Sequence, residues 1–151
     1  NSQHRESAMI LPSEALRRAA EDTFANLAFM FPAGEAGEGQ GEVSAWRAVA
    51  LSFTGPLNGK LAMKVSDDLP GPIAANMLGL DDETPTAEQQ ADALRELLNV
   101  ICGNMLPILA GSEEVFDVGA PAIVDAAGFE IQDPIRLWLE GGVAELSLVL
   151  T

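Results

Sequence analysis

The chain is poor in the side chains that carry most enzyme chemistry. Its 151 residues include one cysteine, Cys102, and one histidine, His4. His4 lies in residues 1–12, which we expect to be a disordered tail or a cloning remnant outside the folded domain. A Ser-His-Asp or Cys-His nucleophile system therefore has no base, and a zinc site has at most one thiolate and one remote imidazole. A lone cysteine forms no internal disulfide, which fits a reducing, cytoplasmic setting.

Basic residues are also scarce. The chain has 8 Lys and Arg against 23 Asp and Glu, and its net charge is −15. Nucleic acid and anionic membrane surfaces would be repelled by this charge, so we expect neither as a partner. A partner with a basic rim would be attracted, although an acidic surface also simply keeps many domains soluble.

Long apolar runs and phosphate-binding glycine motifs are missing as well. No segment approaches the roughly 18 consecutive apolar residues of a membrane span, and we expect no signal peptide. No G-x-x-x-x-G-K-S/T or G-x-G-x-x-G motif stands between a strand and a helix. What remains for chemistry is carboxylates and amides, on a chain whose length suits one domain.

The most regular segment that is present is residues 86–111, which predict a long helix. Thr86 and Gln89 have the spacing of a capping box. Pro107 has no amide hydrogen to donate, so we expect a kink or an early end between Gly103 and Pro107. Apolar residues recur every three or four positions and predict one stripe that faces the core; they are Leu94, Leu97, Leu98, Ile101, Met105, Ile108 and Leu109.

Polar residues and a glycine form a second line on the same helix. They are Asp92, Glu96, Asn99 and Gly103. Spacings of four, three and four residues place them within about 60° of arc, roughly opposite the apolar stripe. We therefore expect the four residues to share one exposed face. The alternative is an ordinary solvated helix face that happens to hold an acid and an amide.

The rest of the chain predicts helices and hairpins. A first helix is expected to open at residue 12 and to run to Phe31, where a proline stops it. Alternating strands over residues 43–54 and 60–65 flank a Gly-Pro-Leu-Asn-Gly turn, which is typical of a hairpin. A short helix is predicted over residues 70–78.

The sequence pattern after Gly111 predicts strands. We expect β structure over 115–118, a strand from about Phe129, and a final hairpin over 135–150 with a Gly-Gly turn. The chain is thus predicted to be an α/β domain of the α+β type, with an antiparallel central sheet flanked by two long helices.

The exposed line of the long helix carries the most specific motif. Asp92, Glu96 and Asn99 match position for position the signature D/S-x-x-x-E-x-x-N, and the chain thereby resembles the CheC/CheX/FliY phosphatases, which act on phosphorylated response regulators in chemotaxis and related two-component signalling. The run VICGN at 100–104 resembles the family's continuation of this motif, and GPLNGKL at 55–61 resembles its strand pair.

This resemblance implies an internal duplication with one working site. The family architecture has two halves that share a sheet, so we expect pseudo-repeats over about 13–79 and 86–151. Asn26 takes the place in the first half that Asn99 holds in the second, whereas Thr23 stands where the acid would be. We therefore expect the Thr23 and Asn26 site to be degenerate, an arrangement more like CheX than CheC.

The substrate that the resemblance implies is an aspartyl phosphate on a receiver domain, with Mg²⁺ and a lysine supplied by that partner and no cofactor of the chain's own. A neutral amide offers an acceptor and two donors, so Asn99 can hold a water in line where a carboxylate would repel the phosphoryl group. In the family the acid pairs with the receiver's lysine, a role carried to Glu96. Asp92 and Gly103 are expected to support docking.

Two other functions stay open from the sequence. One is a noncatalytic module that binds a receiver through the same helix. The other is a structural or dimerisation domain that shares only the fold. A homodimer formed through sheet edges is implied by the CheX resemblance rather than by any residue pattern.

Overall fold

The structure is a computed structural model that describes residues 10–33, 43 and 45–151. Within these residues three α-helices, a 3₁₀ turn and six strands follow one another. They are α2 (Pro12–Leu27), β1 (Trp46–Thr54), β2 (Gly59–Ser66), α3 (Pro70–Leu78), α4 (Ala87–Ala110), β3 (Asp117–Val118), β4 (Ala122–Val124), η2 (Ala126–Gly128), β5 (Ile135–Leu139) and β6 (Gly142–Leu150). Most of the expected N-terminal tail, residues 1–9, lies outside the described residues.

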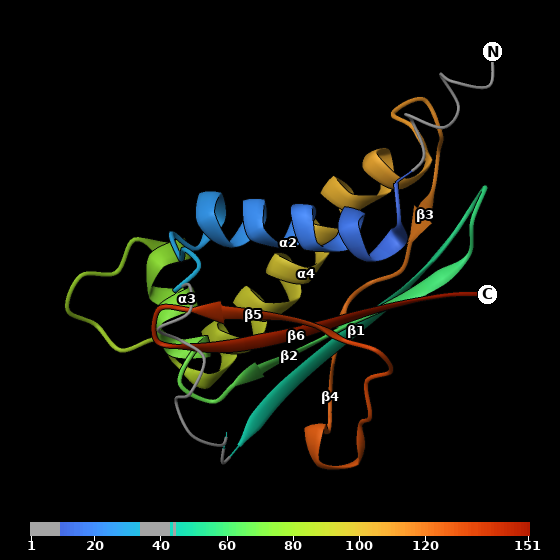
Figure 1. Cartoon of the computed structure of the whole chain (residues 1–151). Coiled ribbons are helices and arrows are strands. Elements are labelled where there is room, and N and C mark those ends of the chain that lie inside the picture. The colour runs from blue at the N-terminus through green and yellow to red at the C-terminus, as the bar shows by residue number, and fades with distance from the viewer. Residues whose placement is uncertain (1–9, 34–42, 44) are drawn as a thin grey trace.

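A single antiparallel sheet lies beneath the helices. Its strand order is β3-β1-β2-β6-β5, and β4 also pairs with β1. β3 pairs with the last residues of β1 and β4 with Ala48 to Ala50, so these two short strands follow one another along the same edge. Figure 1 shows α2 and α4 crossing over one side of this sheet. The mixed α+β class and the two predicted hairpins are confirmed.

The core lies between that side of the sheet and the helices. Strand residues of one parity are buried, as the alternating pattern predicted; they include Val49, Leu51, Phe53, Leu61, Met63, Val65, Ala144 and Leu146. The opposite side of the sheet carries charged residues. Arg136 on β5 faces Glu145 on β6, and its Nε donates to Glu145 Oε2 at 2.8 Å. The helices therefore cover one face of the sheet, and the Arg136–Glu145 cross-strand ion pair lies on the other.

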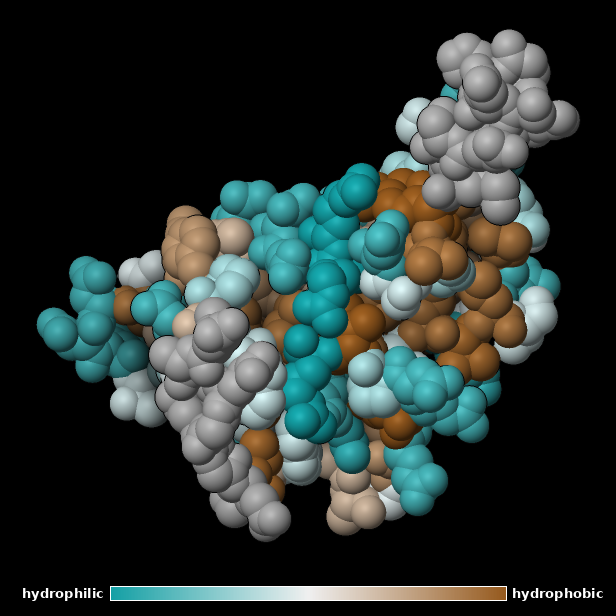
Figure 2. Space-filling view, in the orientation of Figure 1, coloured by the Kyte–Doolittle hydropathy of each residue, from teal (hydrophilic) through white to brown (hydrophobic). Residues whose placement is uncertain are grey.

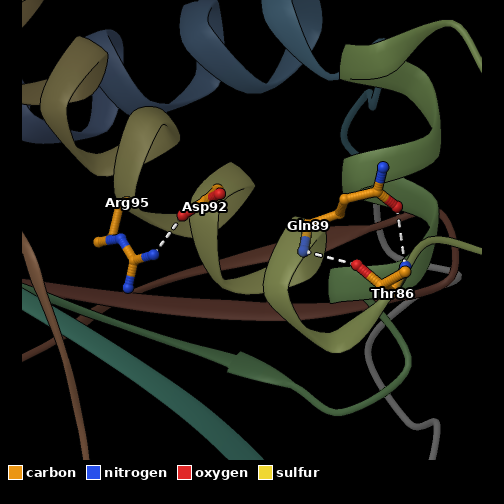
Figure 3. A network of polar contacts seen from close by, with 4 residues as sticks. All are labelled: Thr86, Gln89, Asp92 and Arg95. Atoms are coloured by element: carbon orange, nitrogen blue, oxygen red, sulfur yellow. Dashed lines mark hydrogen bonds and ion pairs between the residues drawn. The ribbon is translucent and has the colours of Figure 1, made fainter.

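Helix α4 begins where the sequence predicted. Thr86 Oγ1 accepts a hydrogen bond from the amide of Gln89 at 3.1 Å, and Gln89 Oε1 accepts one from the amide of Thr86 at 2.9 Å (Figure 3). This capping box is therefore confirmed. The predicted apolar stripe is buried through Met105, whereas Ile108 and Leu109 are partly buried against the core.

Of the two outcomes expected near Pro107, a kink or an early end, the early end does not occur, because the helix passes through Pro107 and continues to Ala110. The carbonyl that loses its partner belongs to Gly103, an exposed residue whose oxygen water can reach. In length and composition α4 alone, among the described helices, would suit a membrane span. Its apolar stripe nevertheless packs against α2, α3 and the sheet, as expected of a core helix.

Helix α2 ends at Leu27, earlier than predicted. The amide of Met30 donates to the carbonyl of Phe24 at 2.9 Å, and Phe29 adopts a left-handed φ of 55°. This turn buries Met30 and leaves Phe31 51% exposed, although the helical period had placed Phe31 on the core face. The local turn outweighs the periodic pattern because it lets Met30 fill the core instead.

The strand expected from about Phe129 is also wrong. The strand that follows β3 is β4, over residues 122–124, and Phe129 instead follows the 3₁₀ turn η2. Asp125 caps this turn by accepting from the amide of Ala127 at 3.1 Å. Asp133 has a φ of 45°, which bends the chain just before β5.

Cys102 lies on the buried side of α4 and gives the first prediction. Burial raises the pKa of its thiol from 9.0 to about 11. A raised pKa in the folded state means that the stabilisation is complete below about pH 9 and is lost as the pH rises toward 11. We expect the free energy of unfolding to fall by about 2 kcal/mol over this range.

Urea unfolding of the wild type and Cys102→Ala at a series of pH values measures this effect. The variant keeps both lysines of the chain, Lys60 and Lys64, and the chain has no tyrosine. A difference between the two proteins in how steeply the free energy of unfolding falls with pH therefore isolates the thiol. Equal slopes in the two proteins above pH 9 would contradict the assignment.

Candidate functional site

The outer face of α4 carries the residues that the sequence predicted. All four are exposed: Asp92, Glu96, Asn99 and Gly103. Leu97, Leu98 and Ile101, which lie between them in sequence, are buried. Residues three and four apart are neighbours on a helix surface, so the Glu96 carboxylate and the Asn99 amide project side by side into solvent.

The two central side chains are free of partners inside the domain. Across residues 10–33, 43 and 45–151, neither Glu96 nor Asn99 makes a side-chain hydrogen bond or an ion pair. A carboxylate and an amide that no neighbouring group holds remain available to the groups of another molecule.

Asp92 differs because it already has a partner. Its Oδ1 forms an ion pair with Nη2 of Arg95, one turn along the helix (Figure 3). The motif did not include Arg95, although the three-residue spacing of an acid and an arginine on a helix predicts such a pair. Asp92 is exposed and Arg95 is partly exposed, so the pair adds little stability. The ion pair places the Arg95 cation next to the exposed line of α4.

Gly103 ends the exposed line one turn beyond Asn99. A Cβ atom placed on Gly103 would meet nothing within 4 Å. The fold of this chain therefore does not require glycine at this position. A glycine here leaves the surface of the helix open at this point.

A groove that sequence reasoning missed opens beside Glu96. It has a volume of about 350 Å³ and is lined by Leu27, Met77, Leu78, Gln89, Asp92, Ala93 and Glu96. These residues come from the end of α2, the last turn of α3 and the first half of α4. The signal in the sequence was the Met-Leu pair at the end of α3, of which Leu78 is 51% exposed.

The corresponding residues of the first half do not form a similar pair. Thr23 is buried, donates from Oγ1 to the carbonyl of Ala19 at 2.7 Å, and accepts from Nδ2 of Asn104 at 3.0 Å. Asn26 is exposed on α2. Thr23 thus joins α2 to α4, and it does not share a solvent face with Asn26.

Metal-binding residues do not gather in the described part of the chain. Among residues 10–33, 43 and 45–151, no three His, Cys, Asp or Glu side chains lie close enough together to hold an ion. The α4 face presents the Glu96 carboxylate, the Asn99 amide and the Asp92–Arg95 ion pair.

A comparison with protein families matches residues 47–141, more than half of the chain, to the family described as chemotaxis phosphatase CheX. The chain belongs to the CheX family. The matched segment begins in β1, ends just beyond β5 and includes Asp92, Glu96 and Asn99, while α2 precedes it. Membership confirms the family resemblance that the α4 motif indicated.

Solved structures of chemotaxis proteins share the fold. Chemotaxis protein CheX from Desulfovibrio desulfuricans is 19% identical with a TM-score of 0.73, over 94% of this chain and 100% of that one. A chemotaxis protein from Desulfovibrio vulgaris Hildenborough is 18% identical, with a TM-score of 0.72 and coverages of 94% and 97%.

CheX from Borrelia burgdorferi, solved as a CheX-CheY-BeF3-Mg²⁺ complex, is 20% identical, with a TM-score of 0.62 and coverages of 91% and 96%. Identities of this size establish the shared fold. A comparison with curated proteins found no match.

The buried position of Thr23 gives the second prediction. We expect Thr23→Glu to lower the free energy of unfolding by about 3 kcal/mol, because it buries a carboxylate between α2 and α4 and removes the hydroxyl that Asn104 contacts. Asn26→Glu, at an exposed position on the same helix, is the matched control and should change stability by less than about 0.5 kcal/mol. Urea unfolding measures both. A Thr23→Glu variant as stable as the wild type would show that this site can accept an acid.

Proposed function

We propose that this CheX-family protein dephosphorylates the aspartyl phosphate of a response-regulator receiver domain. In this proposal Asn99 orients the attacking water and Glu96 pairs with the receiver's lysine. The observation that carries it is the exposed acid and amide, one helical turn apart and free of partners within the described residues. The family itself is one of chemotaxis phosphatases.

In this reaction the main requirement on the protein is to align a water molecule with the phosphorus atom. Water attacks the phosphorus atom, the bond between phosphorus and the aspartyl oxygen breaks, and the products are a carboxylate and inorganic phosphate. Phosphoryl transfer depends mainly on positioning and on stabilising charge. The Asn99 carbonyl oxygen can accept a hydrogen bond from the water and hold it in line, and the amide carries no charge to repel the phosphoryl oxygens.

Glu96 suits a different group in the receiver's phosphorylation site, the lysine. A carboxylate beside a phosphoryl group is repelled, but beside a lysine it gains a charge-assisted hydrogen bond that is desolvated when the two proteins meet. The lysine and the phosphoryl group lie in one receiver pocket, which explains why the acid and the amide must be neighbours on one face. Glu96 is therefore assigned to docking and Asn99 to chemistry.

The partner in this proposal supplies the metal. A CheX from Borrelia burgdorferi was solved in a complex with CheY, BeF3 and Mg²⁺, which supports a receiver domain as the partner and a Mg²⁺ that comes with it. Receiver signalling of this kind belongs to the cytoplasm, in line with the lone cysteine. Asp92, which is paired with Arg95, contributes to the charge next to Glu96, and Gly103 leaves room for the receiver backbone.

The third prediction separates the two roles. Incubated with a phosphorylated, Mg²⁺-bound receiver domain, Asn99→Ala should slow phosphate release at least about 100-fold and change the dissociation constant less than about threefold. Glu96→Ala should weaken binding at least about tenfold and lose activity with it, because the receiver's lysine is left unpaired. Phosphate release and calorimetric titration measure the two quantities.

Matched controls use other exposed residues of the same types. Glu88→Ala removes an acid from the first turn of α4, and Asn26→Ala removes an amide from α2; both should retain full activity. Wild-type protein that binds the receiver without speeding phosphate loss would identify a noncatalytic binding module instead. Size-exclusion chromatography of the same samples tests the predicted homodimer.

A further inference from the structure

The groove beside Glu96 has the composition of an interface centre. Its apolar lining residues Leu27, Met77 and Ala93 are buried or half-buried, whereas the acids Asp92 and Glu96 are exposed at its rim. Protein interfaces commonly have this arrangement, with an anchor side chain seated in an apolar pocket and polar groups around it. Leu78, which lines the groove, is 51% exposed, and Phe29, two residues after the end of α2, is 62% exposed.

We propose that this groove receives an apolar side chain from a loop that borders the receiver's phosphorylation site, so that Leu78 and Met77 help to select the receiver. The proposal rests on the proposed function, since it places the same partner on the same face. It adds a second contact, which takes no part in the reaction.

Continuity with the Glu96 contact identifies the occupant. Glu96 lines the groove and also lies beside Asn99 on the outer face of α4, so a lysine paired with Glu96 lies at the mouth of the groove. In CheY-like folds the reactive groups lie at the carboxyl ends of the sheet strands, where the loops gather. A side chain from a neighbouring loop can therefore reach the groove while the lysine meets Glu96.

Charge complementarity supports the same occupant. Glu96 makes no ion pair within the described residues and leaves a negative charge at the rim, where Asp92 is paired with Arg95, and the whole chain carries a net charge of −15. An apolar group flanked by a cation matches such a rim, whereas an apolar group flanked by acids would be repelled. A second copy of this acidic chain is for that reason a poorer occupant.

The walls of the groove are already held in place. Asn76 on α3 donates from Nδ2 to the carbonyl of Ala28 at 2.7 Å, which ties α3 to the end of α2. Gly79, with a φ of 69°, ends α3 directly after Leu78. A preformed groove costs little ordering on binding, and the flexible Met77 side chain can adapt to the shape of the anchor.

The fourth prediction tests the groove with Leu78→Ala. We expect KM for a phosphorylated receiver, and the dissociation constant for the same receiver charged with beryllium fluoride and Mg²⁺, to rise about tenfold, while kcat changes less than twofold. Leu78→Asp should raise both constants further, because it adds an acid where an apolar group must sit. Val115→Ala is the control. Val115 is 81% exposed and follows the far end of α4, where hydrophobic side chains also gather on the surface (Figure 2).

The outcomes separate this proposal from the proposed function. Unchanged KM and dissociation constant in Leu78→Ala, with activity still lost in Asn99→Ala, would overturn the groove and leave the phosphatase standing. Receiver binding that depends on Leu78, in a wild type that does not speed phosphate loss, would overturn the phosphatase and support the groove. A change in oligomer size in Leu78→Ala with no change in receiver binding would assign the groove to a second copy and overturn the proposal.

Discussion

The burial of one stripe of α4 is the constraint on which the rest depends. Leu94, Leu98 and Met105 are almost wholly enclosed between α2, α3 and the sheet. Each residue of a helix advances by about 100°, so this burial also decides which residues face water. A rotation by one residue would carry polar side chains toward the core, at a cost of several kcal/mol for each one left unpaired. The outward direction of Glu96 and Asn99 is thus fixed by the packing of the opposite face.

The two long helices have different roles in the fold. In α2 the position that would hold an acid is Thr23, which bonds to its own helix and to Asn104 of α4. A residue that holds two helices together is closed to a partner, so α2 acts as the support against which α4 is oriented. α3, fixed to the end of α2 through Asn76, completes the support and supplies one wall of the groove.

Sequence alone predicted what is encoded by local periodicity. The capping box of α4, its buried stripe and its exposed line follow from spacings within one segment, as does the β1–β2 hairpin. The end of α2 and the location of β4 depend on competition between distant segments: Met30 outcompetes Phe31 for the core, and β4 pairs with an edge of β1. The groove depends on the arrangement of distant segments too, since Leu27 and Leu78 come to line one groove only in the folded chain.

The local motif and the groove formed by distant segments bear on different properties: the motif on the proposed reaction, and the groove on the selection of a receiver. In the proposed reaction, any receiver that carries an aspartyl phosphate, its lysine and its Mg²⁺ offers the same reacting groups to Glu96 and Asn99. Interactions with shared groups cannot discriminate among partners, because discrimination is a difference between affinities. Selectivity must therefore come from contacts that the reaction does not use. The apolar surface that adjoins Glu96 is the nearest place on this molecule where such contacts can be made.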